Sequence, residues 1–272
     1  MANARMSGKS VKGYGRFRSL TRKALQNVSH AAAQSPLDAE RLIACGIDPE
    51  KLQVSGNLKF DLSIPPGLEQ QARLWRKQWG EDRPVLIAGS THTEDDIVVL
   101  EAFRLILAAF ENTLLILVPR HPERFSATAQ LARDSGFKTE MYSDEPDRSA
   151  GTQCLVVDSM GELLHFYACS NVAVIGGSFA AIGGHNALEA AALGLPVIVG
   201  PHTENFAEIT DDLIRNGAAI RVSDANQLAN QLINLLGDSE KRHAMGNAGK
   251  QMLAQGRGAL RSTLEAVERL IG

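Results

Sequence analysis

From residue 84 onward, short and continuous apolar runs alternate with stretches of helical periodicity. The runs cover residues 85–89, 114–120, 154–158, 171–175, 196–199 and 218–222. Strands that are buried on both faces of a parallel sheet have such unbroken apolar sequences, whereas half-exposed strands alternate apolar and polar residues. The pattern therefore predicts a doubly wound, Rossmann-like α/β domain with a parallel sheet over residues 84–223.

Capping signals and loop residues place the other elements. Ser35 and Pro36 mark the start of a helix that ends at Gly46, and the paired prolines 65 and 66 indicate a surface loop. Further helices are expected at 68–79, 94–110, 123–135, 161–167, 185–193, 206–216, 226–236, 240–255 and 260–271, with strands at 28–34, 52–55 and 138–142 and a polar loop at 143–152. We expect residues 1–50 to be the remnant of an amino-terminal domain and residues 51–272 to form the ligand-binding domain.

The segment between residues 174 and 206 indicates where a ligand binds. A predicted strand runs into Gly176, Gly177 and Ser178, and the pair Gly183 and Gly184 precedes the predicted helix at 185–193. Glycines at the carboxyl end of a strand let a ligand approach the backbone, and the N–H groups at a helix start favour a phosphate. The alternative is a turn between strand and helix whose glycines only allow tight packing.

Two polar residues in the predicted helix favour the ligand interpretation. Asn186 and Glu189 are three residues apart and would share a helix face. A carboxylate there is suited to accept hydrogen bonds from ribose hydroxyls while the helix start faces a phosphate. We therefore interpret this segment as half of a nucleotide-sugar site.

Polar, charged and glycine residues also follow three other predicted strands, and ligands of such sheets bind at the carboxyl ends of the strands. Arg120 can hold a phosphate through two hydrogen bonds, although an ion pair with Glu123 is the alternative, and Arg124 is expected to be solvated. The motif 90–92 can contact a phosphate or only cap the next helix. The donor or phosphate contacts considered on these grounds are Ser90, His92, Gly177, Ser178 and Gly184.

Composition excludes several other classes of function. A net charge of −3 gives no general indication of nucleic-acid binding, and the three cysteines form no CxxC pattern. The seven histidines show no HExxH motif, so no metal site and no cofactor is predicted. No signal peptide or long apolar run is visible, and the chain itself is expected to be cytosolic and soluble. No pair of residues resembles a nucleophile with its base, so no catalytic residue is assigned.

The charges are unevenly distributed along the chain. Before Asp38 there is no acidic residue, while basic residues accumulate over positions 5–30, with Phe17, Leu20, Ala24 and Val28 near helical spacing. A basic amphipathic segment of this kind can lie on an anionic membrane surface or hold an anionic substrate. A solvated helix face explains the same pattern.

Taken together, the motifs resemble the 3-deoxy-D-manno-octulosonic acid (Kdo) transferase family. The matching pieces are NARMS (3–7), AQSPLDAERL (33–42), VSGNLKFD (54–61), GSTHTED (89–95), LLILVPRHPERF (114–125), DSMGEL (158–163) and the stretch from GGSFAAIGGHNALEAAALG to PHTENF (176–206). They run in family order through nearly the whole chain, and the combination of PRHPER with GGHNxLE is specific.

The resemblance implies a GT-B glycosyltransferase that moves Kdo from CMP-Kdo to the lipid A precursor lipid IV-A, at the cytoplasmic face of the bacterial inner membrane. Most of the chain would be its carboxyl-terminal, donor-binding domain. By position, the residues that would contact CMP are Pro119, Arg120, Met160, Gly161, Glu162, Asn186, Ala187, Leu188 and Glu189. The resemblance implies no metal.

Two departures from the family pattern limit which residue roles of the family can be assigned to this chain. The family's Ser-Thr-His motif is followed by one residue and then Gly-Glu, whereas Thr93, Glu94 and Asp95 follow here. Family members also begin with a membrane anchor and an acceptor domain that carries an acidic base. Because this chain is expected to lack both, we expect it to bind CMP weakly and to transfer no Kdo alone.

Other functions remain open from the residues alone. The same glycine-rich segment would serve a UDP-sugar transferase or epimerase of the GT-B fold, or a non-catalytic nucleotide-binding module. A dinucleotide oxidoreductase is disfavoured because no GxGxxG motif follows an early strand with an acidic residue about 20 positions later.

Overall fold

The computed structural model describes residues 1–144 and 151–271, and part of the predicted polar loop 143–152 lies outside these residues. The chain divides into two compact units, one formed by Met1–Ser63 with Leu253–Gly272 and the other by Ile64–Met252. The first unit therefore extends beyond residue 50 and includes the carboxyl-terminal residues. The helix α11 (Ser239–Gly256) crosses the limit between the units in the sequence.

The second unit contains a seven-stranded parallel sheet, which confirms the predicted doubly wound α/β fold. The strand order is β5-β6-β4-β3-β7-β8-β9, and the pairings are parallel. The strands are β3 (Val85–Thr91), β4 (Leu114–Pro119), β5 (Thr139–Met141), β6 (Cys154–Val156), β7 (Val172–Ile175), β8 (Val197–Val199) and β9 (Ala219–Arg221). Nearly all their side chains in the centre of the sheet are buried, as the unbroken apolar runs predict.

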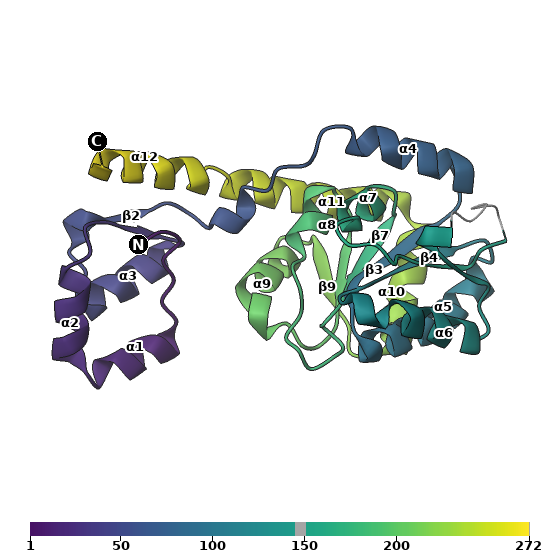
Figure 1. Ribbon diagram of the computed structural model, residues 1–272, viewed down its shortest axis with the longest axis horizontal. Coiled ribbons are helices and arrows are strands. Elements are labelled where there is room, and N and C mark those ends of the chain that lie inside the picture. Colours follow the sequence, from purple (N-terminus) through teal and green to yellow (C-terminus); the bar gives the residue numbers. More distant parts are fainter. Residues whose placement is uncertain (145–150, 272) are drawn as a thin grey trace. The chain divides into compact units, whose positions relative to one another are not determined.

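Helices cover both faces of this sheet. The helices of this unit are α4 (Leu68–Trp79), α5 (Thr93–Ala109), α6 (Phe125–Asp134), α7 (Leu163–Ala168), α8 (Leu188–Ala192), α9 (Ala207–Arg215) and α10 (Ala225–Gly237). Figure 1 shows α5, α6 and α10 together on one face and α7 and α8 on the other. On the first face Phe103 and Leu232 pack with Leu86 and Val174 of the sheet in one apolar cluster. On the second, Trp75 stacks on Phe166 with ring centroids 4.7 Å apart.

The helices predicted at 185–193 and 123–135 start later than their sequences suggested. The helix predicted at 185–193 begins only at Leu188, because Gly183 and Gly184 have positive φ and the following residues stay outside the helix. The Asn186 side chain accepts a hydrogen bond from the backbone N–H of Leu188 at 3.1 Å. The prediction that Asn186 and Glu189 share a helix face was therefore wrong. Similarly, the helix predicted at 123–135 divides into a 3₁₀ turn, η3 (Pro122–Arg124), and α6.

The first unit is built around a small parallel pair of strands, β1 (Ala31–Ala33) and β2 (Leu52–Val54). Its helices are α1 (Gly8–Gly15), α2 (Arg18–Gln26), α3 (Pro36–Cys45) and α12 (Ala259–Ile271), with 3₁₀ turns at η1 (Pro49–Lys51) and η2 (Leu58–Phe60). The Ser35 side chain accepts from the backbone N–H of Asp38, which confirms the predicted start of α3. Ala31, Ala33 and Leu42 form the centre of its core.

Candidate functional site

The candidate site lies where the order of the strands in the sheet reverses. The strands β3, β4 and β6 succeed one another toward one edge, after which β7 returns to the opposite side of β3. Such sheets bind ligands beside the carboxyl ends of the strands at this reversal point. The two motifs singled out in the sequence, 90–92 at the end of β3 and 176–178 after β7, therefore lie next to each other.

A close approach between these two segments requires glycine. An ideal Cβ atom at Gly176 would lie 2.2 Å from the carbonyl oxygen of Ser90, far inside any normal contact. Gly177 adopts φ +68°, and a Cβ there would lie 2.9 Å from the ring of His185. Both glycines are therefore required for this close packing, and the packing itself brings the two segments to one place.

A buried carboxylate ties the two segments together. Asp95, in the first turn of α5, is 1% exposed. Its carboxylate accepts the backbone N–H groups of His92 and Gly177 at one oxygen and of Phe179 and Ala180 at the other, at distances of 2.7–3.2 Å. At this position the family pattern has its Glu, and in this chain the carboxylate has a structural task.

Three histidines gather at the same edge. The Nε2 atoms of His92 and His185 lie 3.0 Å apart, and the ring centroid of His121 lies 5.6 Å from that of His92. Burial is the main cause that lowers the pKa of both His92 and His185, and neighbouring cationic groups, including His121, lower them further. The charge of Arg120 also lowers the pKa of His185. Because their pKa values are lowered, His92 and His185 are uncharged near neutral pH, and the exposed Arg120 beside them favours an anion.

The two arginines of the PRHPER motif have different environments. The Arg120 backbone N–H donates to the carbonyl of Thr91 at 3.0 Å, and its side chain is exposed. Arg124, which the sequence suggested to be solvated, instead forms an ion pair of 2.7 Å with the fully buried Asp96 and donates to the carbonyl of Thr91 at 3.0 Å. Arg120 is therefore the arginine that can contact a ligand, whereas Arg124 is bound to Asp96 and to the backbone of Thr91.

Met160, Gly161 and Glu162 follow β6, two strands away from β3. Met160 is 56% exposed, and the Glu162 carboxylate lies 3.2 Å from Nδ1 of His165. The segment lies at the same carboxyl edge of the sheet but contributes nothing to the histidine cluster. It is a candidate for the base-binding part of a nucleotide site.

The remaining predicted residues surround the turn between β7 and α8. Ala187 and Leu188 are buried, whereas Asn186 and Glu189 are half-buried. Burial raises the pKa of Glu189, and the charge of Glu189 adds to the burial that raises the pKa of Tyr167. The buried Ser178 hydroxyl accepts the backbone N–H of Gly200 at 2.8 Å, and Gly184 donates to the carbonyl of Gly177 at 2.7 Å. Ser178 and Gly184 thus shape the loop from within.

The contacts of three residues were not predicted from the sequence. These are the bonds of Asp95 to the glycine loop, the pairing of His185 with His92 and the ion pair of Arg124 with Asp96. Two signals pointed to them, since Asp95 stands where the family has Glu and Arg124 belongs to the PRHPER motif. Within residues 1–144 and 151–271 no group of histidine, cysteine or acidic residues is arranged to hold a metal ion.

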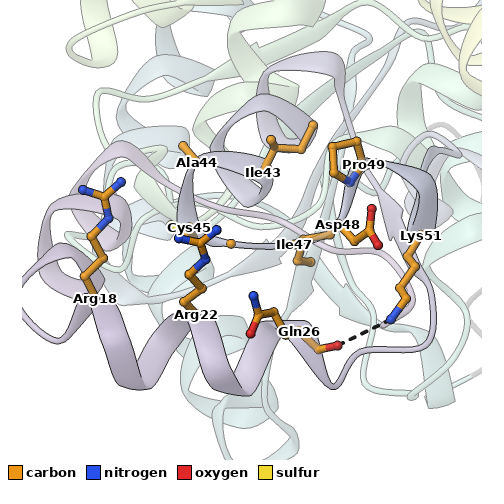
Figure 2. Close-up of a pocket in the computed structure, with 11 residues that line it drawn as sticks. Arg18, Arg22, Gln26, Ile43, Ala44, Cys45, Ile47, Asp48, Pro49 and Lys51 are labelled. Atoms are coloured by element: carbon orange, nitrogen blue, oxygen red, sulfur yellow. Dashed lines mark hydrogen bonds between the residues drawn. The ribbon is translucent and has the colours of Figure 1, made fainter.

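The first unit offers a separate basic groove. It has a volume of about 620 Å³ and is lined on one side by α2 and on the other by the end of α3 and η1. Figure 2 shows Arg18, Arg22 and Gln26 extending from α2, with the Lys51 ammonium donating to the Gln26 carbonyl at 3.5 Å. Phe17 and Leu20 of the same segment are 69% and 68% exposed. No helix of the described residues is long and apolar enough to cross a membrane.

Comparison with known families gives two matches. The family model described as 3-deoxy-D-manno-octulosonic-acid transferase (kdotransferase) matches residues 1–62. The model described as glycosyl transferases group 1 matches residues 97–252, which include the histidine cluster's loop at 176–185 and the PRHPER motif.

Individual relatives agree with these matches. The 3-deoxy-D-manno-octulosonic acid transferase of Haemophilus influenzae is 39% identical over 98% of this chain and 63% of its own length. That of Bordetella pertussis is 36% identical over 100% of this chain and 64% of its own length. A solved structure, the carboxyl-terminal CMP-Kdo binding domain of WaaA from Acinetobacter baumannii, is 34% identical with a TM-score of 0.66, covering 69% of this chain and 98% of that domain. The chain thus spans slightly less than two thirds of these two curated relatives.

Proposed function

Because the chain belongs to the Kdo transferase family and to the group 1 glycosyl transferases, we propose that it binds CMP-Kdo and serves Kdo transfer to a lipid A precursor. The observation that carries the proposal is the convergence of Arg120 with the histidine cluster at the reversal point of the sheet. A cation there can stabilise the charge that develops on the CMP phosphate as the glycosidic bond breaks. Similarity to a domain that is described as binding CMP-Kdo supports the choice of donor.

The nucleotide is proposed to lie along the carboxyl edge from β6 to β7. Pro119 and Arg120 would hold the phosphate end, Met160, Gly161 and Glu162 the cytosine, and the segment 186–189 the ribose, with Glu189 accepting from its hydroxyls. The exposure of Met160 and Arg120 and the half-burial of Glu189 fit these contacts. Ser90, His92, Gly177, Ser178 and Gly184 would shape the phosphate subsite.

We propose that these 272 residues supply donor binding and that activation of the acceptor hydroxyl depends on a base from outside them. The chain covers 63% and 64% of the two curated relatives, and its site presents groups that hold a leaving phosphate. The purified chain is accordingly expected to bind CMP weakly and to transfer no Kdo. Transfer by the chain alone would contradict this part of the proposal.

Calorimetric titration with CMP and UMP tests the donor. We expect selective binding of CMP that is weakened about tenfold or more by Arg120→Ala, which removes a charge-assisted contact, and also by Glu189→Ala. Arg73→Ala and Glu101→Ala are matched controls, because both residues are exposed on helices, α4 and α5, and neither belongs to the proposed site. Preference for UMP would favour a UDP-sugar transferase or epimerase, and binding of CMP without transfer after an acceptor domain is restored would favour a non-catalytic module.

For the first unit we propose contact with the anionic inner-membrane surface through α2. Arg18 and Arg22 face the basic groove, and the exposed Phe17 and Leu20 provide apolar side chains for the lipid interface. Co-sedimentation with vesicles is expected to be strong for anionic phosphatidylglycerol and weak for neutral phosphatidylcholine. The double variant Arg18→Ala/Arg22→Ala should abolish the difference, and Arg73→Ala should not.

A further inference from the structure

The Asp95 carboxylate has a hydrogen-bonding pattern that only an ionised carboxylate can satisfy. Four backbone N–H groups point at its two oxygens, and all four distances are between 2.7 and 3.2 Å. The side chain is 1% exposed, so water does not replace a lost partner. An asparagine of the same shape would direct an NH₂ group at two of these donors, which can only donate themselves.

These four hydrogen bonds hold the backbone segments that carry His92 and His185. One of them fixes the backbone of His92, and the other three fix the loop that begins at Gly177. That loop holds His185, because the His185 N–H donates to the carbonyl of Gly176 at 3.1 Å and its ring packs against Gly177. A change at the Asp95 carboxylate is therefore expected to shift both members of the histidine pair through their backbone.

The separation of 3.0 Å between the two Nε2 atoms restricts their protons. One Nε2 must carry a proton and the other must present a lone pair, so the neutral pair contains one Nε2–H and one Nδ1–H tautomer. A single additional proton can be accommodated on the Nδ1 atom of the donor ring, whereas a second Nε2 proton would break the contact between the rings. The pair can therefore take up one proton without being separated.

The charged surroundings decide when that proton is taken up. The groups that face His92 are Asp95 and Glu94 of α5, His121 and Arg124, and those that face His185 are His92, Arg120, Asp95 and His121. The cationic groups and burial disfavour the protonated pair in the free protein. An anion placed beside the pair offsets both effects and favours protonation.

We propose that Asp95 is a positioning residue that holds His92 and His185 as a proton-sharing pair, and that this pair takes up one proton when the phosphate of the donor nucleotide binds. The second half rests on the proposed donor function, whereas the first concerns the free protein alone. The affinity for the nucleotide then increases as the pH falls from 8 toward 6.

Nitrogen-15 NMR of labelled histidines tests the first half. In the free wild-type protein at pH 7.5 we expect one of the two histidines as the Nε2–H tautomer and the other as Nδ1–H. Asp95→Asn should remove this asymmetry, and Glu94→Gln, which changes an exposed neighbour, should preserve it. Identical tautomers in the wild type would overturn the pair, and an unchanged pair in a folded Asp95→Asn protein would overturn the role of Asp95.

Calorimetry with CMP in buffers of different ionisation enthalpy tests the second half and does not need the Asp95 variant to fold. The wild type should take up close to one proton more than His92→Gln/His185→Gln, a comparison that removes the protonation of CMP itself. His243→Gln, on an exposed position of α11, should behave as wild type. Equal proton uptake in both proteins would overturn the proposal. Absence of CMP binding would overturn the donor function instead, while the tautomer measurement still decides the role of Asp95.

Discussion

Removal of the Arg124 guanidinium should destabilise the second unit by an amount that depends on pH. Arg124 is the cationic partner of Asp96, with a side-chain separation of 2.7 Å and an Asp96 side chain that is 0% exposed. Without Arg124 the carboxylate stays buried and unpaired, which costs about 3–5 kcal/mol in comparable cases. Such a loss is a large share of a typical stability of about 5–15 kcal/mol.

Protonation of Asp96 limits the loss of unfolding free energy in the Arg124→Ala variant. An unpaired buried carboxyl can become neutral, and for an ordinary aspartate pKa of about 3.9 that costs about 4 kcal/mol at pH 7 and about 1.5 kcal/mol at pH 5. Burial already raises the pKa of Asp96 in the wild type, and loss of Arg124 should raise this pKa further. A native pKa above that of the unfolded chain means that stability decreases as the pH rises through the interval between them. The effect of Arg124→Ala should therefore be larger at pH 7 than at pH 5.

Urea unfolding followed by tryptophan fluorescence measures this difference, because both tryptophans, Trp75 and Trp79, belong to α4 of the same unit. The double variant Arg124→Ala/Asp96→Asn should lose most of the pH dependence, since no buried carboxyl remains. Arg73→Ala, whose side chain is 78% exposed, serves as the control. A loss below about 1 kcal/mol at pH 7, or an equal loss at both pH values, would refute the assignment of a stabilising buried pair.

Two further predictions follow from the packing of the second unit and from its thiols. Gly176→Ala should cost at least about 2 kcal/mol in urea unfolding and weaken CMP binding, because its methyl group would lie 2.2 Å from the Ser90 carbonyl oxygen; unchanged stability would show that the two segments can separate. The three cysteines are buried, and burial raises the pKa of the Cys154 thiol, so an aromatic disulfide reagent should label none of them rapidly before unfolding. Fast labelling of a thiol in the native protein would contradict the described core.

Local sequence determined most of the secondary structure of this protein. The apolar runs at 85–89 and 114–120 predicted β3 and β4, and Ser35 with Gly46 delimited α3, because burial pattern and helix capping depend on neighbouring residues. The same information predicted the doubly wound sheet, which the structure confirms, and the motifs identified the family correctly. The helix predicted at 185–193 begins only at Leu188, because the two glycines of positive φ before it do not adopt helical backbone conformations.

The tertiary structure alone decided which side chains act together. Asp95 meets Gly177 across 82 positions of sequence, and His92 meets His185 across 93, because β3 and β7 are neighbours in the sheet. Arg124 looked solvated from its local sequence, yet it lies over a carboxylate that belongs to α5. Periodicity and capping signals carry information over a few residues, whereas strand order brings distant segments into contact. The sequence by itself thus pointed to the carboxyl edge of the sheet as the candidate site, and only strand pairing decided that the buried carboxylate of Asp95 joins the two segments there.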